Sequence, residues 1–182
     1  MLILASASPR RKELISIISK DVSIKPAEVD ESFTNDIKAE NVPEMLAVRK
    51  AAFVAKEYPN DTVIGCDTSV IIDGVILGKP TDCEDAKRML RMLSGKTHKV
   101  ITGCAIFKCC RSLSFSEVTD VTFYSLTEKE IDDYVHTMEP MDKAGSYGIQ
   151  GYGSLLVKEI HGDYFNVVGL PVGKLNKMLK KI

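Results

Sequence analysis

LILASASPRRKEL, residues 2–14, is the stretch of this sequence that decides the fold. Leu2 to Ala5 are apolar, which is typical of a buried strand. Ser8 followed by Pro9 predicts a helix start, because serine caps a first turn and proline needs no N–H at the first helical position. The stretch is therefore predicted to be a strand, a turn and the start of a helix that ends near residue 20.

The predicted helix start carries three cationic residues, Arg10, Arg11 and Lys12. Free N–H groups and a partial positive charge at a helix start favour anions. The full positive charges of these side chains would make this turn a binding site for phosphates. Arginines in a first turn can also be solvated or paired with carboxylates, so the stretch by itself leaves both interpretations open.

Length and charge restrict the class of protein. The chain has 182 residues, 45% of them hydrophobic, which is enough for one sizeable core and predicts a single domain over residues 1–182. Its 24 cationic and 25 acidic side chains give a net charge of −1. No general field therefore attracts nucleic acid or a membrane surface. The apolar runs are shorter than the roughly 18 residues of a membrane span, so we expect a cytoplasmic protein.

Five cysteines without C-x-x-C spacing indicate reduced thiols rather than a zinc site. Apolar strands alternate with helical patterns, and Asp73-Gly74 between two apolar runs predicts a tight hairpin. Capping boxes at Thr81 with Glu84 and at Thr127 with Glu130 predict two helix starts. One helix is expected over residues 41–58, and its predicted buried side consists of Met45, Leu46, Ala52, Phe53 and Ala55. These patterns predict an α/β fold with a mixed, twisted sheet. Neither the P-loop nor the G-x-G-x-x-G fingerprint is present.

Two acidic positions stand out. Thr62 to Cys66 is a nearly continuous apolar run, predicted to be a buried strand that ends at Asp67. A carboxylate there, followed by Thr68, suits metal binding or proton transfer better than packing. The polar stretch 27–39 offers Glu31 and other carboxylates, which could hold a divalent ion or form a plain acidic loop.

Two further segments carry candidate ligand-binding groups. The hairpin around Asp73-Gly74 is expected to return Lys79 towards Asp67, where the two charges would flank a phosphate or simply form an ion pair. Residues 138–153 are rich in glycine, which permits tight curvature beside a ligand. Within them, the amide of Gln150 can donate to and accept from the edge of a base.

Seven blocks along nearly the whole chain resemble the Maf family of nucleoside triphosphate pyrophosphatases, in the family's order. They are SASPRRKEL (6–14 with Ala5 before it), VDES (29–32), RKA (49–51), GCDT (65–68), GKP (78–80), LSGKTH (93–98) and DKAGSYGIQG (142–151). The resemblance implies an elongated Maf-like α/β domain with a central cleft, similar to the inosine triphosphatases. It also implies hydrolysis between the α and β phosphates, a divalent cation (Mg or Mn) and a homodimer.

The resemblance also implies a role for each matching residue. Asp67 would be the catalytic base or position the attacking water, and Glu31 and Asp67 would hold the metal. Substrate phosphates would be bound by Ser6, Arg10, Arg11, Lys12, Lys50 and Lys79. Base specificity would depend on Arg10, Thr68 and Gln150.

The form of the glycine-rich block predicts the base. With Lys143 and Gln150 it resembles the family members that act on dTTP and UTP, whereas those acting on 7-methyl-GTP have an acidic residue in place of the glutamine. A neutral amide suits the alternating acceptors and donors of uracil or thymine, and a carboxylate would repel their carbonyl oxygens. Cys66 departs from the family's usual alanine before Asp67.

Two alternatives to this prediction stay open at this point. One is the 7-methyl-GTP pyrophosphatase just described. The other is a regulatory nucleotide-binding protein linked to septum inhibition, which would share the phosphate-binding residues. The carboxylates favour the enzyme, because a binding protein gains nothing from them near phosphates unless a metal is held there.

Overall fold

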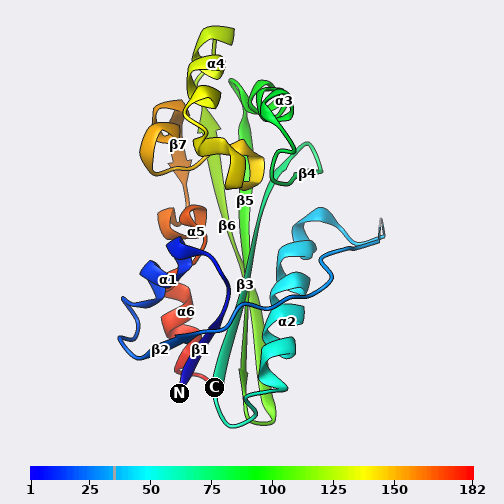
Figure 1. Ribbon diagram of the computed structural model, residues 1–182, viewed down its shortest axis with the longest axis vertical. Coiled ribbons are helices and arrows are strands. Elements are labelled where there is room, and N and C mark those ends of the chain that lie inside the picture. The colour runs from blue at the N-terminus through cyan, green and yellow to red at the C-terminus, as the bar shows by residue number, and fades with distance from the viewer. Residues whose placement is uncertain (35) are drawn as a thin grey trace. The chain divides into compact units, whose positions relative to one another are not determined.

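The computed structural model describes residues 1–34 and 36–182 of the chain (Figure 1). Its sheet has seven strands: β1 (Leu2–Ala5), β2 (Val22–Ile24), β3 (Thr62–Ile72), β4 (Val75–Leu77), β5 (Thr97–Lys108), β6 (Arg111–Phe123) and β7 (Val157–His161). The strand order is β2-β1-β3-β5-β6-β7, with β4 paired to β3. Pairing is parallel between β1 and its neighbours but antiparallel for β3–β4 and β6–β7. The predicted α/β fold with a mixed sheet is thus confirmed.

The helices are α1 (Pro9–Ile15), α2 (Val42–Ala55), α3 (Cys83–Leu93), α4 (Glu128–His136), α5 (Tyr164–Val168) and α6 (Val172–Leu179). Short 3-10 turns lie at η1 (Ala39–Asn41), η2 (Glu139–Asp142), η3 (Ala144–Ser146) and η4 (Gly151–Leu156). Across residues 1–34 and 36–182, every helix is too short or too polar to cross a membrane.

The chain divides into two compact units. Unit 1 consists of residues 1–68, 102–117 and 165–182, and unit 2 of residues 69–101 and 118–164. The strands β3, β5 and β6 each contribute residues to both units. One domain over residues 1–182 with a central cleft stays a prediction.

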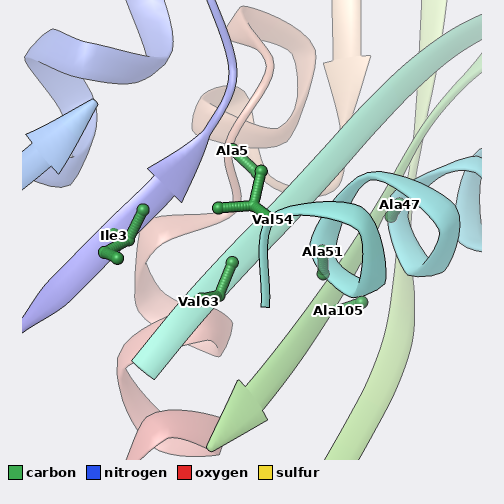
Figure 2. Packing of buried hydrophobic residues seen from close by; sticks show 7 residues of the cluster. All are labelled: Ile3, Ala5, Ala47, Ala51, Val54, Val63 and Ala105. Carbon is green, nitrogen blue, oxygen red and sulfur yellow. The ribbon is translucent and has the colours of Figure 1, made fainter. Parts of the chain in front are cut away.

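In unit 1 the sheet is covered closely by α2. Figure 2 shows small side chains of α2, among them Ala47 and Ala51, against residues of β1 and β3. The backbone of α2 lies very close to β3, since a Cβ atom added at Gly65 would collide with the carbonyl oxygen of Ala47. Gly103 on β5 meets the backbone of the first turn of α2 in the same way. Glycine on the sheet therefore lets the helix backbone lie directly on the strands.

Of the predicted buried face of α2, Leu46 is buried and Met45, Ala52 and Ala55 are half-buried, whereas the prediction is wrong for Phe53. The buried residues are Val42, Pro43, Leu46, Ala47, Ala51 and Val54. Phe53 is 41% exposed, because the glycines of the sheet favour the face with the smallest side chains. A prediction from amphipathic periodicity favours the larger apolar residues, such as Phe53, and so places the buried face away from the small side chains that contact the sheet.

Two boundaries in unit 1 also differ from the prediction. The helix α1 begins as predicted, with the Ser8 hydroxyl accepting a hydrogen bond from the Arg11 N–H at 3.4 Å. It ends at Ile15 rather than near residue 20, and Ile17 is 65% exposed. The strand β3 continues through Asp67 to Ile72 instead of ending there, because side-chain partners satisfy its polar residues.

Unit 2 follows the local signals more closely. The hairpin β3–β4 turns at Asp73-Gly74, where φ is +51° and +77°, as predicted. The α4 capping box at Thr127 and Glu130 is present. The helix α3 is capped by Asp82, which accepts from the Asp85 N–H at 2.8 Å, and not by the expected Thr81. The core of unit 2 includes a buried cluster of three rings, His98, Phe123 and Tyr147.

Candidate active site

The most concentrated charge in unit 1 surrounds the Lys50 ammonium. Its Nζ lies 2.7 Å from Oδ1 of Asp67 and 2.8 Å from Oε1 of Glu31. Lys50 comes from the middle of α2, Asp67 from β3, and Glu31 from the loop that follows β2. The structure thus brings together three of the predicted site residues from three separate segments.

The environment of Asp67 suits a proton acceptor. Its side chain is 13% exposed, and that of Lys50 is 12% exposed. Burial raises the pKa of the Asp67 carboxyl, an effect that the charges of Lys50 and Arg11 oppose without cancelling. A carboxylate with a raised pKa is a better general base near neutral pH than an ordinary aspartate.

The donor set also fits a divalent cation of the predicted kind. Within the described residues, no group of three or more His, Cys, Asp and Glu side chains is arranged to hold a metal. Asp67 and Glu31 nevertheless converge on one cation, the Lys50 ammonium. Mg²⁺ is commonly held by one or two carboxylates together with substrate phosphates. The carboxylates of Asp67 and Glu31 are therefore ligands of the type and number that such a site needs.

The Arg11 guanidinium donates hydrogen bonds to four acceptors, two backbone carbonyls and two side-chain hydroxyls. Its Nε donates to the carbonyl oxygen of Gly169 at 2.8 Å, and Nη2 donates to the Thr68 hydroxyl at 2.8 Å. Nη1 donates to the Cys66 carbonyl at 3.0 Å and to the Ser6 hydroxyl at 3.3 Å. The guanidinium thereby joins the turn after β1, the middle of β3 and the segment before α6.

Thr68 is in turn held by residues that the sequence did not single out. Its hydroxyl lies 2.9 Å from that of Thr102 on β5. The Thr102 N–H donates to Oδ1 of the buried Asn166 at 3.1 Å, and the Thr102 hydroxyl donates to the Asn166 carbonyl at 3.0 Å. The sequence carries no local signal for this support, because the burial of Asn166 and its bonds to Thr102 arise from segments far apart along the chain.

Cys66 and Cys104 lie behind the carboxylate cluster as buried free thiols, with 3.6 Å between their sulfur atoms. All five cysteines are free thiols. Cys66 therefore fills core volume beside Asp67 where the family more often has alanine, as a small hydrophobe would.

Unit 2 contains the other two predicted site residues, Lys79 and Gln150. The glycine-rich segment docks against the end of β4, because the Gly145 N–H donates to the carbonyl of Gly78 at 3.0 Å. A Cβ atom at Gly145 would lie 2.8 Å from the side chain of Val70, so only glycine permits this contact. Lys79 and Gln150 are both exposed.

The functional roles predicted for these residues stay predictions. The structure places Ser6, Arg11, Lys50, Glu31, Asp67 and Thr68 in one unit, linked through Lys50 and Arg11. Arg10 on α1 is half-buried and Lys12 is exposed. The predicted approach of Lys79 to Asp67 joins residues of different units and also stays a prediction.

The fold is that of the Ham1 proteins. The Ham1 protein of Staphylococcus aureus superposes with a TM-score of 0.58 at 14% identity, covering 99% of this chain and 98% of that one. A HAM1 protein of Coxiella burnetii gives a TM-score of 0.56 at 15% identity, covering 100% and 98%. At such identities the likeness concerns the fold alone.

Sequence comparison identifies the family within that fold. The family model described as Maf-like protein matches residues 1–182, and the chain belongs to the Maf family. A protein of Bacillus mycoides named dTTP/UTP pyrophosphatase is 50% identical over 180 residues, which are 99% of this chain and 94% of that protein. One of Bacillus velezensis with the same name is also 50% identical, over 99% and 95%. The predicted family is confirmed.

Proposed function

We propose that this protein hydrolyses dTTP and UTP to the nucleoside monophosphate and pyrophosphate. The observation that carries the proposal is the convergence of Glu31 and Asp67 on Lys50 in unit 1. The names of relatives at about half identity over nearly the whole chain support the substrate class. Modified uridine triphosphates would be accepted as well.

In this proposal, Asp67 accepts a proton from the attacking water, or positions it, as the water oxygen bonds to the α-phosphorus. The bond from that phosphorus to the bridging oxygen breaks, and pyrophosphate leaves. Bound by Glu31 and Asp67, Mg²⁺ or Mn²⁺ would supply charge neutralisation at the phosphates. Lys50 would contact phosphate oxygens, with Lys79 and the cationic turn at Arg10, Arg11 and Lys12 neutralising the leaving group.

Arg11 has a second task in this proposal. Its hydrogen bonds to Ser6, Cys66, Thr68 and Gly169 orient the turn after β1 relative to β3. A guanidinium that donates to several fixed acceptors has little freedom to move. It would therefore keep Asp67 and Thr68 in place, so that little reorganisation is needed during the reaction.

Base selection is assigned to Gln150, together with Arg10 and Thr68. The neutral amide of Gln150 would pair with the edge of uracil or thymine, whose groups alternate between acceptor and donor. A carboxylate in its place would repel the two carbonyl oxygens of these bases.

The test is pyrophosphate release from a panel of nucleoside triphosphates, with Mg²⁺ or Mn²⁺ and with chelator. We expect dTTP and UTP to be the fastest substrates and chelator to abolish turnover. Asp67→Asn keeps the shape and removes the ionisable group, so turnover should fall by about 10²–10⁴-fold while the variant folds normally. Absence of pyrophosphate release from every nucleotide would refute the proposal, and faster turnover of 7-methyl-GTP would overturn the base assignment.

We further propose a cytoplasmic homodimer. The near-neutral net charge of −1 and the family membership support a protein whose partners are a small-molecule substrate and a second copy, not nucleic acid. A light-scattering mass of one chain at micromolar concentration would refute the stable dimer.

A further inference from the structure

The carboxylate of the half-buried Glu139 accepts hydrogen bonds from the segment that carries Gln150. In unit 2, its Oε1 accepts from the Gly153 N–H at 3.0 Å and from the Tyr134 hydroxyl at 3.0 Å. Its Oε2 accepts from the Tyr152 N–H at 2.9 Å. Both N–H groups belong to the first turn of η4, which begins directly after Gln150. The carboxylate therefore holds the backbone immediately beyond the candidate specificity residue.

Tyr134 completes the same arrangement on the other side of Gln150. Its hydroxyl donates to Glu139 and accepts from the Gly148 N–H at 3.1 Å. Tyr134 is buried in α4, and burial raises the pKa of its phenol, so the hydroxyl remains a neutral donor. Glu139 and Tyr134 thus hold the chain both two residues before Gln150 and two to three residues after it.

The segment has no room for other side chains at these points. A Cβ atom at Gly151 would lie 2.6 Å from Oε2 of Glu139, and φ there is +67°, which disfavours other residues. A Cβ atom at Gly148 would lie 2.7 Å from Cε of Lys143, and one at Gly153 would lie 2.7 Å from the Tyr134 hydroxyl. The glycines let the backbone close around the carboxylate and the phenol, so the conformation of the segment depends on them.

We infer that Glu139 is a positioning residue for base selection, because its carboxylate and the Tyr134 hydroxyl hold residues 148–153 in the conformation that presents Gln150. The inference rests on the proposed function and deepens it. Glu139 lies in η2, outside the phosphate-binding segments of unit 1. Its loss should therefore change which base is accepted more than the rate at which the α–β bond breaks.

The chemistry of a carboxylate is required here, since two backbone donors and one hydroxyl donor point at its two oxygens. In Glu139→Gln, one oxygen becomes an NH₂ group, which would face a backbone N–H as a second donor. At least one hydrogen bond must then break, and the segment must move. Glu159 on β7 is an exposed glutamate in the same unit, so Glu159→Gln is a matched control for the same chemical change.

The experiment measures kcat and KM for dTTP, UTP and GTP in the wild type, E139Q, E159Q, Q150A and the double variant E139Q/Q150A. We expect E139Q to raise KM for dTTP and UTP about tenfold, with kcat changed less than about threefold. The preference for dTTP over GTP should fall by a similar factor. E159Q should match the wild type. If Glu139 acts through Gln150, the double variant should be no less selective than Q150A alone.

Hydrogen exchange of the 148–156 backbone gives a readout that needs no turnover. The amides of Tyr152 and Gly153 should exchange faster in E139Q than in E159Q, with the rest of unit 2 unchanged. If E139Q does not fold, Y134F tests the same role, since it loses the hydroxyl shared by Glu139 and Gly148. It should shift selectivity in the same direction by a smaller factor.

The outcomes separate this inference from the proposed function. If E139Q kept wild-type selectivity, or lowered kcat equally for every nucleotide, the positioning role would be overturned and the enzyme activity would stand. If the wild type released no pyrophosphate, the proposed activity would fall instead. Binding of the non-hydrolysable α,β-imido analogues of dUTP and GTP by E139Q would then decide the inference. A changed preference supports it and an unchanged one overturns it.

Discussion

The two units hold their candidate site residues by opposite means. In unit 1, Lys50 lies between two carboxylates and Arg11 donates to four acceptors, so full charges maintain the arrangement. In unit 2, the segment around Gln150 is shaped by glycines and by backbone N–H groups that donate to Glu139, together with the neutral Tyr134 phenol. The first arrangement depends on cationic side chains, and the second on backbone geometry and backbone donors.

The difference corresponds to two separate demands of the proposed reaction. A triphosphate carries the same charges whatever its base, so its recognition calls for fixed cations and carboxylates. Uracil and thymine are neutral, and discrimination between bases depends on where a few hydrogen-bonding groups lie. The first predictions alter one unit and use the other as reference, and the last compares two glycines within unit 1.

The largest effect is expected from Lys50→Met. Removal of the ammonium leaves the Asp67 carboxylate, 13% exposed, without its ion-pair partner. Breaking such a buried pair on one side costs about 3–5 kcal/mol in the free energy of unfolding, and turnover should fall by about 10²-fold or more. Urea titration and pyrophosphate release measure the two quantities.

Lys87→Met in unit 2 is the matched control for Lys50→Met. Lys87 also contacts two carboxylates, Glu84 at 3.1 Å and Asp132 at 2.7 Å, but these are 77% and 45% exposed. Solvated ion pairs contribute little to stability, so the free energy of unfolding and the turnover should hardly change. An equal loss in both variants would mean that burial of Asp67 does not distinguish the units.

The next largest effect concerns the free energy of unfolding at acidic pH, to which His98 in unit 2 and Asp67 in unit 1 should contribute with opposite signs. Burial lowers the pKa of His98 in unit 2 from 6.5 to about 4. Between these values the unfolded chain binds a proton that the folded chain does not, so the free energy of unfolding falls by about 3 kcal/mol as pH drops. Asp67 in unit 1 has a raised pKa, so the folded chain takes up its proton first and stability rises as pH falls towards 3.8.

Two variants separate these contributions in urea titrations at pH 7, 6, 5 and 4. His98→Gln should lose less stability on acidification than the wild type, because its side chain stays neutral. Asp67→Asn should lose more, because the compensating uptake of a proton is gone. Identical pH profiles for all three proteins would show that neither group controls the acid response.

The smallest of these effects concerns the glycines of unit 1. Gly65→Ala should lower the free energy of unfolding by about 2 kcal/mol, because its Cβ atom would force α2 away from β3. Gly173→Ala on α6 meets nothing within 4 Å and should instead raise it by about 0.5 kcal/mol. Thermal unfolding of both variants checks the opposite signs.

Local signals predicted the elements whose causes lie within a few residues. Ser8 and Pro9 start α1, Asp73-Gly74 turns the hairpin, and Thr127 with Glu130 caps α4, because each motif satisfies its own backbone groups. The convergence of Glu31 with Lys50 and Asp67 followed from family resemblance, since their distance along the chain gives no local signal.

The failures have non-local causes. The end of β3 was misplaced at Asp67 because a polar residue normally interrupts an apolar strand, whereas here Lys50 and Arg11 supply partners for Asp67 and Thr68. The buried face of α2 depends on Gly65 and Gly103, which belong to other segments. The short helix α5 and the role of Asn166 were missed, since the bond to Thr102 spans 64 residues. Periodicity within one segment contains no information about such partners.

The bond from Arg11 to the Gly169 carbonyl joins residues 158 positions apart. During synthesis, Arg11 is made long before Gly169, which belongs to the last described segment of unit 1, residues 165–182. The set of hydrogen bonds from Arg11 to Cys66, Thr68 and Gly169 is therefore complete only once this segment has been made. A chain that stopped before residue 165 would carry the cationic turn at residues 10–12 without the Gly169 carbonyl that helps to fix it.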